Sequence, residues 1–177
     1  MLFFRAALLR GTLAMVKESI AILTLGLLLL PGCQHNPWAD RFLTVQAAEK
    51  DVAGTYVIDA DSQKRTIRIG LSNIPFPVSH SARIVLSADH NAEFISVPED
   101  YRGERACSVT GRGSWRLGKN DSFTEVRASI VNEELTSPCT GKFDYELMLY
   151  GKKPPYKLHI TIGDPDSGDA VQFEKRQ

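Results

Sequence analysis

The sequence lacks any apolar stretch long enough to cross a bilayer as a helix. Such a helix needs about 20 consecutive apolar residues, and the uncharged run from Ile20 to Cys33 is much shorter. This run therefore predicts a signal peptide over residues 1–32, and basic residues precede it as such a signal requires, at Arg5, Arg10 and Lys17. Met15 directly precedes a compact signal of ordinary size, so we predict that translation starts there.

The sequence also lacks an excess of charge of either sign, with 21 basic and 21 acidic residues. Removal of residues 1–32 takes away three basic residues and one acidic residue, which leaves 18 basic against 20 acidic residues. This slightly acidic balance argues against nucleic acid as a partner. The chain contains no H-E-x-x-H motif, no phosphate-binding P-loop and no dinucleotide fingerprint. We therefore expect a non-enzymatic protein without a cofactor.

Cysteine is scarce, and the first of the three cysteines ends the signal. Leu30-Pro31-Gly32-Cys33 resembles the lipobox of bacterial lipoproteins. The resemblance implies that Cys33 carries lipid, becomes the mature N-terminus and anchors the chain to a membrane of the cell envelope. Gln34 follows where an Asp retains enterobacterial lipoproteins in the inner membrane, which implies the outer membrane, with the protein facing the periplasm. The alternatives are an ordinary signal peptide, or an anchor that is retained, with Cys33 incidental.

If Cys33 carries lipid, Cys107 and Cys139 are left as a single pair in an oxidising compartment. We predict that they form a disulfide, which would stabilise the fold by roughly 3 to 4 kcal/mol on the chain-entropy model. Two buried free thiols are the alternative. A zinc site is disfavoured, because neither cysteine has a second Cys or His at ligand spacing.

The mature chain is predicted to form one β domain over residues 52–177, preceded by a tether or short helix over residues 33–51. In this preceding segment Trp38, Phe42 and Val45 are spaced as on one face of a helix. From Val52 onward the hydrophobic period becomes two, as in half-buried strands. We expect about eight short strands, within residues 54–58, 66–71, 83–87, 93–97, 107–117, 125–130, 143–149, 157–162 and 171–173.

This pattern predicts an all-β fold, a small antiparallel up-and-down barrel of the lipocalin-like kind. The two prolines of residues 73–81 are expected to break the strand ladder. Residues 88–91 are expected to form a hairpin turn, with Asp89 and Asn91 supplying its tight conformation. Gly111 and Gly113 would let a strand bend sharply or let Trp115 pack against the backbone.

Three stretches resemble a group of uncharacterised bacterial lipoproteins and secreted proteins with lipocalin-like barrels. They are Gly54-Thr55-Tyr56, Gly113-Ser114-Trp115 and the closing GDPDSGDAVQFEK of residues 163–175. The resemblance implies the barrel fold and no catalytic residue. Gly113 to Trp115 is also similar to the G-x-W signature of lipocalins, although that signature lies in their first strand. A core tryptophan beside a glycine explains the same residues.

Few residues offer a chemistry of their own. Asp164, Asp166 and Asp169 offer carboxylates to a calcium ion, but their spacing departs from an EF-hand loop and a structural turn is the simpler reading. His80 and His159 accompany no nucleophile motif and are expected to face solvent. A basic cluster is expected to be a solvated face or, if functional, to bind anionic glycan or lipopolysaccharide; it comprises Arg102, Arg105, Arg112, Arg116 and Lys119.

Two functions follow as hypotheses for a lipid-anchored envelope protein. The first is the binding of a small apolar or lipidic ligand inside the barrel or at its mouth, which requires a cavity of several hundred Å³ (~300 Å³ or more). The second is a protein-interaction role, as a hydrolase inhibitor or an accessory subunit of an envelope complex. This second role predicts an exposed patch on loops such as residues 73–81 or 98–106.

Overall fold

The computed structural model describes residues 36–64, 66–69, 72–75, 79–99, 108–120, 122–133, 140–162 and 168–177. Strands dominate these residues. In chain order they are β1 (Gly54–Ile58), β2 (Thr66–Ile69), β3 (Ser72–Pro75), β4 (Arg83–Leu86), β5 (Asn91–Pro98), β6 (Ser108–Lys119), β7 (Thr124–Asn132), β8 (Gly141–Tyr150), β9 (Lys157–Thr161) and β10 (Ala170–Lys175). The helices in this part of the chain are short, namely the 3-10 helices η1 (Ala39–Arg41) and η2 (Ser62–Lys64) and the single-turn α2 (Glu49–Val52).

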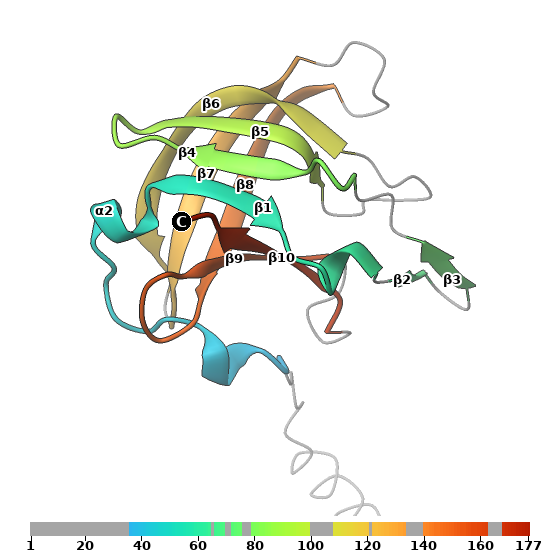
Figure 1. Cartoon of the computed structure of the whole chain (residues 1–177), viewed down its shortest axis with the longest axis horizontal. Helices are drawn as coiled ribbons and strands as arrows, with labels where there is room; N and C mark the ends of the chain where they lie inside the picture. Colours follow the sequence, from blue (N-terminus) through green and yellow to red (C-terminus); the bar gives the residue numbers. More distant parts are fainter. Residues whose placement is uncertain are drawn as a thin grey trace, which may run out of the picture. The chain divides into compact units, whose positions relative to one another are not determined.

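Eight of these strands form a closed antiparallel barrel in the order β1-β10-β9-β8-β7-β6-β5-β4 (Figure 1). From β4 to β10, each strand pairs with the next one in the sequence. β1 closes the ring by pairing with both β4 and β10. The predicted all-β fold with an up-and-down barrel is therefore confirmed. No helix in the described residues is long and apolar enough to span a membrane.

The hairpin of β2 and β3 departs from the expected strand pattern. Residues 66–71 were expected as a barrel strand and residues 73–81 as a break in the ladder. Instead, β2 pairs only with β3, in a separate two-stranded sheet that runs from Thr66 opposite Pro75 to Ile69 opposite Ser72. Pro75 lacks a backbone N–H but occupies the end of a two-stranded ribbon, where that donor is not needed by a further strand.

The barrel interior is filled by side chains that alternate along the strands. Tyr56, Ile84, Phe94, Leu147 and Phe173 are at most 1% exposed, and the whole set of buried apolar side chains is at most 6% exposed. In β4 and the first half of β5 the buried residues alternate with less buried ones, as the predicted period-two pattern requires, whereas β9 and β10 also bury consecutive residues. Burial of apolar area of this kind supplies most of the driving force for folding.

A sharp corner in β6 depends on two glycines. A Cβ atom added to Gly113 would lie 1.8 Å from the carbonyl oxygen of Ser129, and one added to Gly111 would lie 1.9 Å from that of Val131. Both contacts are with the backbone of β7, which pairs with β6 here and approaches these two positions closely. Trp115 follows and is 3% exposed, with Nε1 donating to the carbonyl oxygen of Ser87 at 2.8 Å. The expectation of a core tryptophan beside glycine is confirmed.

The predicted hairpin turn lies between β4 and β5. The Asp89 carboxylate accepts hydrogen bonds from the backbone N–H and the side-chain amide of Asn91. The residue with positive φ is His90, at 66°. Asp89 thus stabilises the turn by side-chain hydrogen bonds, as expected of turn aspartates, while its neighbour adopts the left-handed conformation.

The segment before β1 packs against one end of the barrel. Figure 1 shows residues 36–52 running along this end before the chain enters β1. Phe42 and Leu43 are each 1% exposed, and the backbone N–H of Leu43 donates to the carbonyl oxygen of Leu149 at 2.9 Å. Val45, by contrast, is 64% exposed. The chain is extended after η1, so Trp38, Phe42 and Val45 do not share a helical face.

Candidate functional site

A groove of about 890 Å³ is lined mainly by residues of β6, β7 and β8. Its lining combines charged and hydroxyl side chains, which occupy the outward-facing positions of these strands, with the apolar residues Trp115, Ala128, Tyr145, Met148 and Ile160. The outward-facing lining residues that matter below are Ser114, Arg116, Arg127, Ser129, Asp144 and Glu146. This surface, together with the adjoining lining residues of β8 and β9, is called the outer groove from here on.

Strand register arranges these six side chains in two rows across the three strands. Ser114 lies opposite Ser129, which lies opposite Asp144, and two residues along the strands Arg116 lies opposite Arg127, which lies opposite Glu146. Side chains directly opposite one another on a sheet have Cβ atoms about 5 Å apart. The β6 side of the outer groove is therefore basic, and its β8 side is acidic.

Arg127 is held in one position by its neighbours. Its Nε donates to the Glu125 carboxylate at 2.6 Å, and Glu125 is fully buried. The side chain of Arg127 also lies against Gly118, where an added Cβ would be 2.9 Å from Nε. The hydrogen bond and the charge of Glu125 raise the pKa of Arg127 above its ordinary value. The guanidinium is thus held through its Nε, and Arg127 lines the outer groove.

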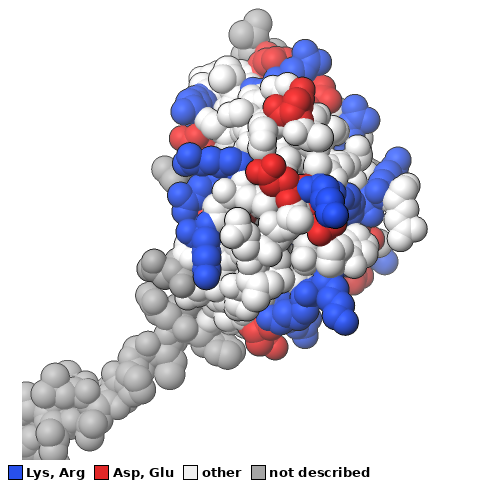
Figure 2. Space-filling view, turned by 90° about the vertical axis from the view of Figure 1, so that its left-hand side faces the viewer, with Lys and Arg blue, Asp and Glu red and all other residues white. Residues whose placement is uncertain are grey.

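The acidic side of the outer groove is also ordered. Ser129 Oγ donates to Asp144 Oδ1 at 2.7 Å, and Lys142 Nζ lies 3.7 Å from the same oxygen. The hydrogen bond from Ser129 holds the pKa of Asp144 below its ordinary value, and the charge of Lys142 acts in the same direction. Asp144 is therefore ionised at neutral pH. Figure 2 shows acidic and basic side chains close together on the face that it presents.

The outer groove borders a gap between β8 and β9. These strands pair only over Met148–Tyr150 of β8 and Lys157–His159 of β9. The lining includes Tyr145 and Glu146 on one side of the gap and Ile160 and Thr161 on the other. An irregular strand junction of this kind gives access to backbone groups that a regular barrel would pair.

A second, smaller hollow of about 300 Å³ lies between α2, the β8–β9 connection and the C-terminus. Its lining includes Lys50, Asp51, Pro154, Pro155 and Lys175. Lys175 Nζ donates to the carbonyl oxygen of Asp51 at 2.8 Å. This hydrogen bond joins α2 to β10 and engages one of the two lysines that line the hollow. We assign this hollow a structural role.

No protein-family model, no curated protein and no solved structure matches the chain. The function is therefore argued from the geometry of the molecule.

Several residues singled out from the sequence lie outside the described residues, namely Cys33, Cys107, Cys139, Asp164 and Asp166. The lipid attachment and the disulfide stay predictions. Asp169 is described and half-buried, and its carbonyl oxygen accepts the backbone N–H of Ile162 at 2.9 Å. Within the described ranges, no three His, Cys, Asp or Glu residues gather as a metal site.

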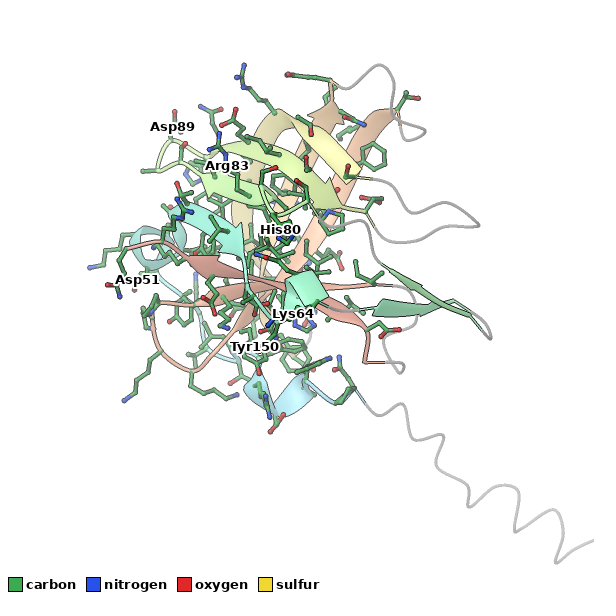
Figure 3. The ribbon with its side chains drawn as sticks, turned by 45° about the vertical axis from the view of Figure 1, so that its right-hand side comes forward. Asp51, Lys64, His80, Arg83, Asp89 and Tyr150 are labelled. Carbon is green, nitrogen blue, oxygen red and sulfur yellow. The ribbon has the colours of Figure 1, made fainter. Side chains whose placement is uncertain are left out.

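The two histidines differ from each other. His80 is exposed, as expected, and its Nδ1 lies 2.7 Å from Gln63 Oε1. His159 was expected to face solvent, which is wrong, because it is 0% exposed. It does point outward from β9, but Trp38 and Phe42 cover it, with ring centroids at 5.5 and 4.9 Å. Tyr150 stacks on His159, with ring centroids 6.0 Å apart. Figure 3 shows that His80 lies apart from Tyr150.

The outer groove was not found from the sequence. The alternation that it depends on is visible there, since Glu125, Arg127 and Ser129 alternate with apolar residues. Alternation shows that these side chains share a face, but the partners across the strands depend on register. Of the predicted basic cluster, Arg116 lies in the outer groove and Arg112 pairs with Glu93 at 3.4 Å. Arg102 and Arg105 lie outside the described residues.

Proposed function

We propose that the protein is a lipid-anchored envelope protein that acts without catalysis, by binding a partner protein at the outer groove. Of the two hypotheses drawn from the sequence, this is the interaction role. One observation carries the choice. The barrel interior is occupied by buried side chains, whereas charged and hydroxyl side chains make up most of the residues that line the hollow of about 890 Å³. Pockets for small apolar ligands are lined predominantly by apolar side chains, and this one has a mixed lining.

The arrangement of charge supports a protein partner. Arg116 of β6 and Arg127 of β7 lie in one row with Glu146 of β8, and in the next row Ser114 and Ser129 lie beside Asp144. Complementary charges of both signs favour one orientation of a partner and disfavour others. Arg127 and Asp144 are held by hydrogen bonds before any partner arrives, so little side-chain entropy is lost when they are engaged.

Attachment through lipid on Cys33 completes the proposal and rests on the resemblance to the lipobox. An outer-membrane anchor facing the periplasm would hold the barrel near partners in the same compartment. Replacement Cys33→Ser is expected to abolish incorporation of labelled palmitate and to release the protein from the membrane fraction. An unchanged membrane fraction would contradict the anchor without bearing on the outer groove.

The interaction itself is tested by placing a photo-crosslinking amino acid in the native envelope. At Ser114, which is exposed and lines the outer groove, we expect one discrete protein adduct on irradiation. At Arg83, an exposed position on β4 away from the outer groove, the same adduct should be missing. Arg116→Glu should remove the adduct at Ser114. Identical adducts at both positions, or none at either, would contradict the proposal.

The ligand hypothesis has its own readout. Protein purified from its native membrane would be extracted with organic solvent, and the extract examined by mass spectrometry. Under our proposal the extract contains no stoichiometric lipid apart from the acyl groups on Cys33. A stoichiometric lipid or apolar metabolite would favour the small-ligand hypothesis instead.

A further inference from the structure

The edge of β8 next to the gap offers unpaired backbone groups. β8 runs from Gly141 to Tyr150, and β7 pairs with it from Gly141 to Met148. On the other side, β9 pairs only with Met148–Tyr150. Within the part of the chain that the structure describes, the stretch Gly141–Leu147 therefore has a strand partner on one side only. At the ordinary rise per residue this edge is about 23 Å long.

The outer groove runs along this edge. Lys142, Asp144 and Glu146 of β8 line it and project outward, while Ile160 and Thr161 of β9 line its far side. A strand edge with free N–H and C=O groups is a template for a further strand. The space beside this edge is lined by residues of β8 on one side and of β9 on the other.

A buried hydroxyl lies at the same place. Tyr145, between Asp144 and Glu146, is 5% exposed and lines the outer groove. Burial raises the pKa of its hydroxyl, and the charge of Glu99 and a hydrogen bond to that carboxylate act in the same direction. The group is therefore a neutral hydroxyl whose nearby acceptor is Glu99.

We propose that an extended peptide segment of the partner protein adds to β8 as a strand along Gly141–Leu147. This inference rests on the proposed interaction function and names the form in which the partner binds. Backbone hydrogen bonds to β8 provide the affinity, as in other cases of strand addition.

The side chains of β8 define the partner's sequence pattern. An added strand alternates in the same way as β8, so one of its faces lies beside Phe143, Tyr145 and Leu147 and must be apolar. Its other face lies beside Lys142, Asp144 and Glu146. Two of these three side chains are acidic, so basic residues on the outer face of the partner segment are favoured.

Two synthetic decapeptides with blocked ends serve as probes, one alternating valine with lysine and the other alternating valine with glutamate. Hydrogen exchange is measured on the mature lipoprotein in detergent micelles, with residue resolution. Without peptide, every second amide of Gly141–Leu147, on the side of the gap, should exchange faster than the amides that bond to β7. The valine–lysine peptide should slow these amides at least about tenfold, and the valine–glutamate peptide should not.

Charge reversal supplies the control for specificity. The double variant Asp144→Lys, Glu146→Lys should exchange the preference, so that the valine–glutamate peptide protects the edge. Glu49→Lys on α2 changes the net charge but lies outside the outer groove and should leave the preference unchanged. Equal binding of both peptides to the charge-reversed variant would overturn the proposal.

Failure of this inference can be separated from failure of the proposed function. If the amides of Gly141–Leu147 are already as slow in the free protein as those facing β7, the edge is covered and strand addition is excluded. A partner crosslinked at Ser114 would in that case still support the interaction role. If neither peptide protects the edge, the inference also fails. If the valine–lysine peptide protects the edge but no adduct forms at Ser114, the site stands and the partner in the envelope is in doubt.

Discussion

The indole Nε1 of Trp38 donates a hydrogen bond to the carbonyl oxygen of Gly168 at 3.2 Å. This contact joins the first described residues to the turn before the last strand. The same ring lies 5.5 Å from His159 and 6.2 Å from Tyr150, measured between centroids. Through these contacts the segment that precedes β1 covers the outer face of β8 and β9, and it becomes part of the packed fold.

Removal of Phe42 should therefore destabilise the barrel. Its ring is 1% exposed and lies 4.9 Å from His159 and 5.2 Å from Phe123. Truncation of a buried phenylalanine costs about 3 to 5 kcal/mol. We expect Phe42→Ala to lower the free energy of unfolding by about this amount in urea denaturation. Val45→Ala, at a position with 64% exposure, should change it by less than about 0.5 kcal/mol.

The corner of β6 should not tolerate a side chain. Gly113→Ala places a Cβ against the carbonyl oxygen of Ser129, and neither backbone can move without disturbing the β6–β7 pairing. We expect a loss of about 3 kcal/mol or more in the free energy of unfolding, or failure to fold. Gly118→Ala is the milder comparison, because the atoms nearest its Cβ belong to the side chain of Arg127, with Nε at 2.9 Å, and not to a backbone. Equal stability of the two variants would contradict the close approach of the two strands.

The pair formed by Arg127 and Glu125 should show strong coupling. Glu125 is fully buried, so Arg127→Met leaves a carboxylate without its cation in a dry environment. We expect this variant to denature at lower urea than the wild type. The double variant Arg127→Met, Glu125→Leu removes the uncompensated charge and should recover part of the loss. If the loss of stability in the double variant equals the sum of the losses in Arg127→Met and Glu125→Leu, the ion pair does not hold Arg127 in place.

The pKa of Asp144 tests whether Ser129 donates a hydrogen bond to this carboxylate on the β8 side of the outer groove. The hydrogen bond from Ser129 lowers this pKa in the folded state, so its stabilising effect is present above the ordinary aspartate pKa and is lost as the pH falls through the lowered value. Ser129→Ala should move the pKa of Asp144 upward. Titration of the carboxyl carbon by NMR measures the shift, and Lys142→Ala should produce a smaller one. An unchanged pKa in Ser129→Ala would contradict the hydrogen bond.

The disulfide stays a prediction, and the described strands next to the two cysteines make it testable. Cys107 directly precedes β6, and Cys139 lies two residues before β8. Both strands begin at the same end of the barrel, where Gly111, Asn132 and Gly141 stand in one row. We expect alkylation of the unfolded, unreduced protein to leave both cysteines unmodified. Replacement of both by serine should cost roughly 3 kcal/mol, and modification without reduction would contradict the pairing.

The strands could be predicted from the sequence because apolar and polar residues alternate along a strand that has one face buried. Residues 54–58 and 143–149 are examples in which the predicted and observed strands agree closely. The pattern does not say which strand lies next to which. The segment 66–71 alternates as well as any other, yet its described residues 66–69 pair in a hairpin outside the barrel. Local periodicity reports burial of one face and leaves the identity of the partner open.

The site was less predictable than the fold, for the same reason. The sequence by itself determined that Arg127, Ser129, Asp144 and Glu146 would face away from the core. Only the tertiary structure decided that Arg116 faces Arg127 and Ser129 faces Asp144, because register is set by how whole strands pack. It also decided the burial of His159. A position that alternation assigns to the outer face is covered here by Trp38, more than a hundred residues earlier in the chain.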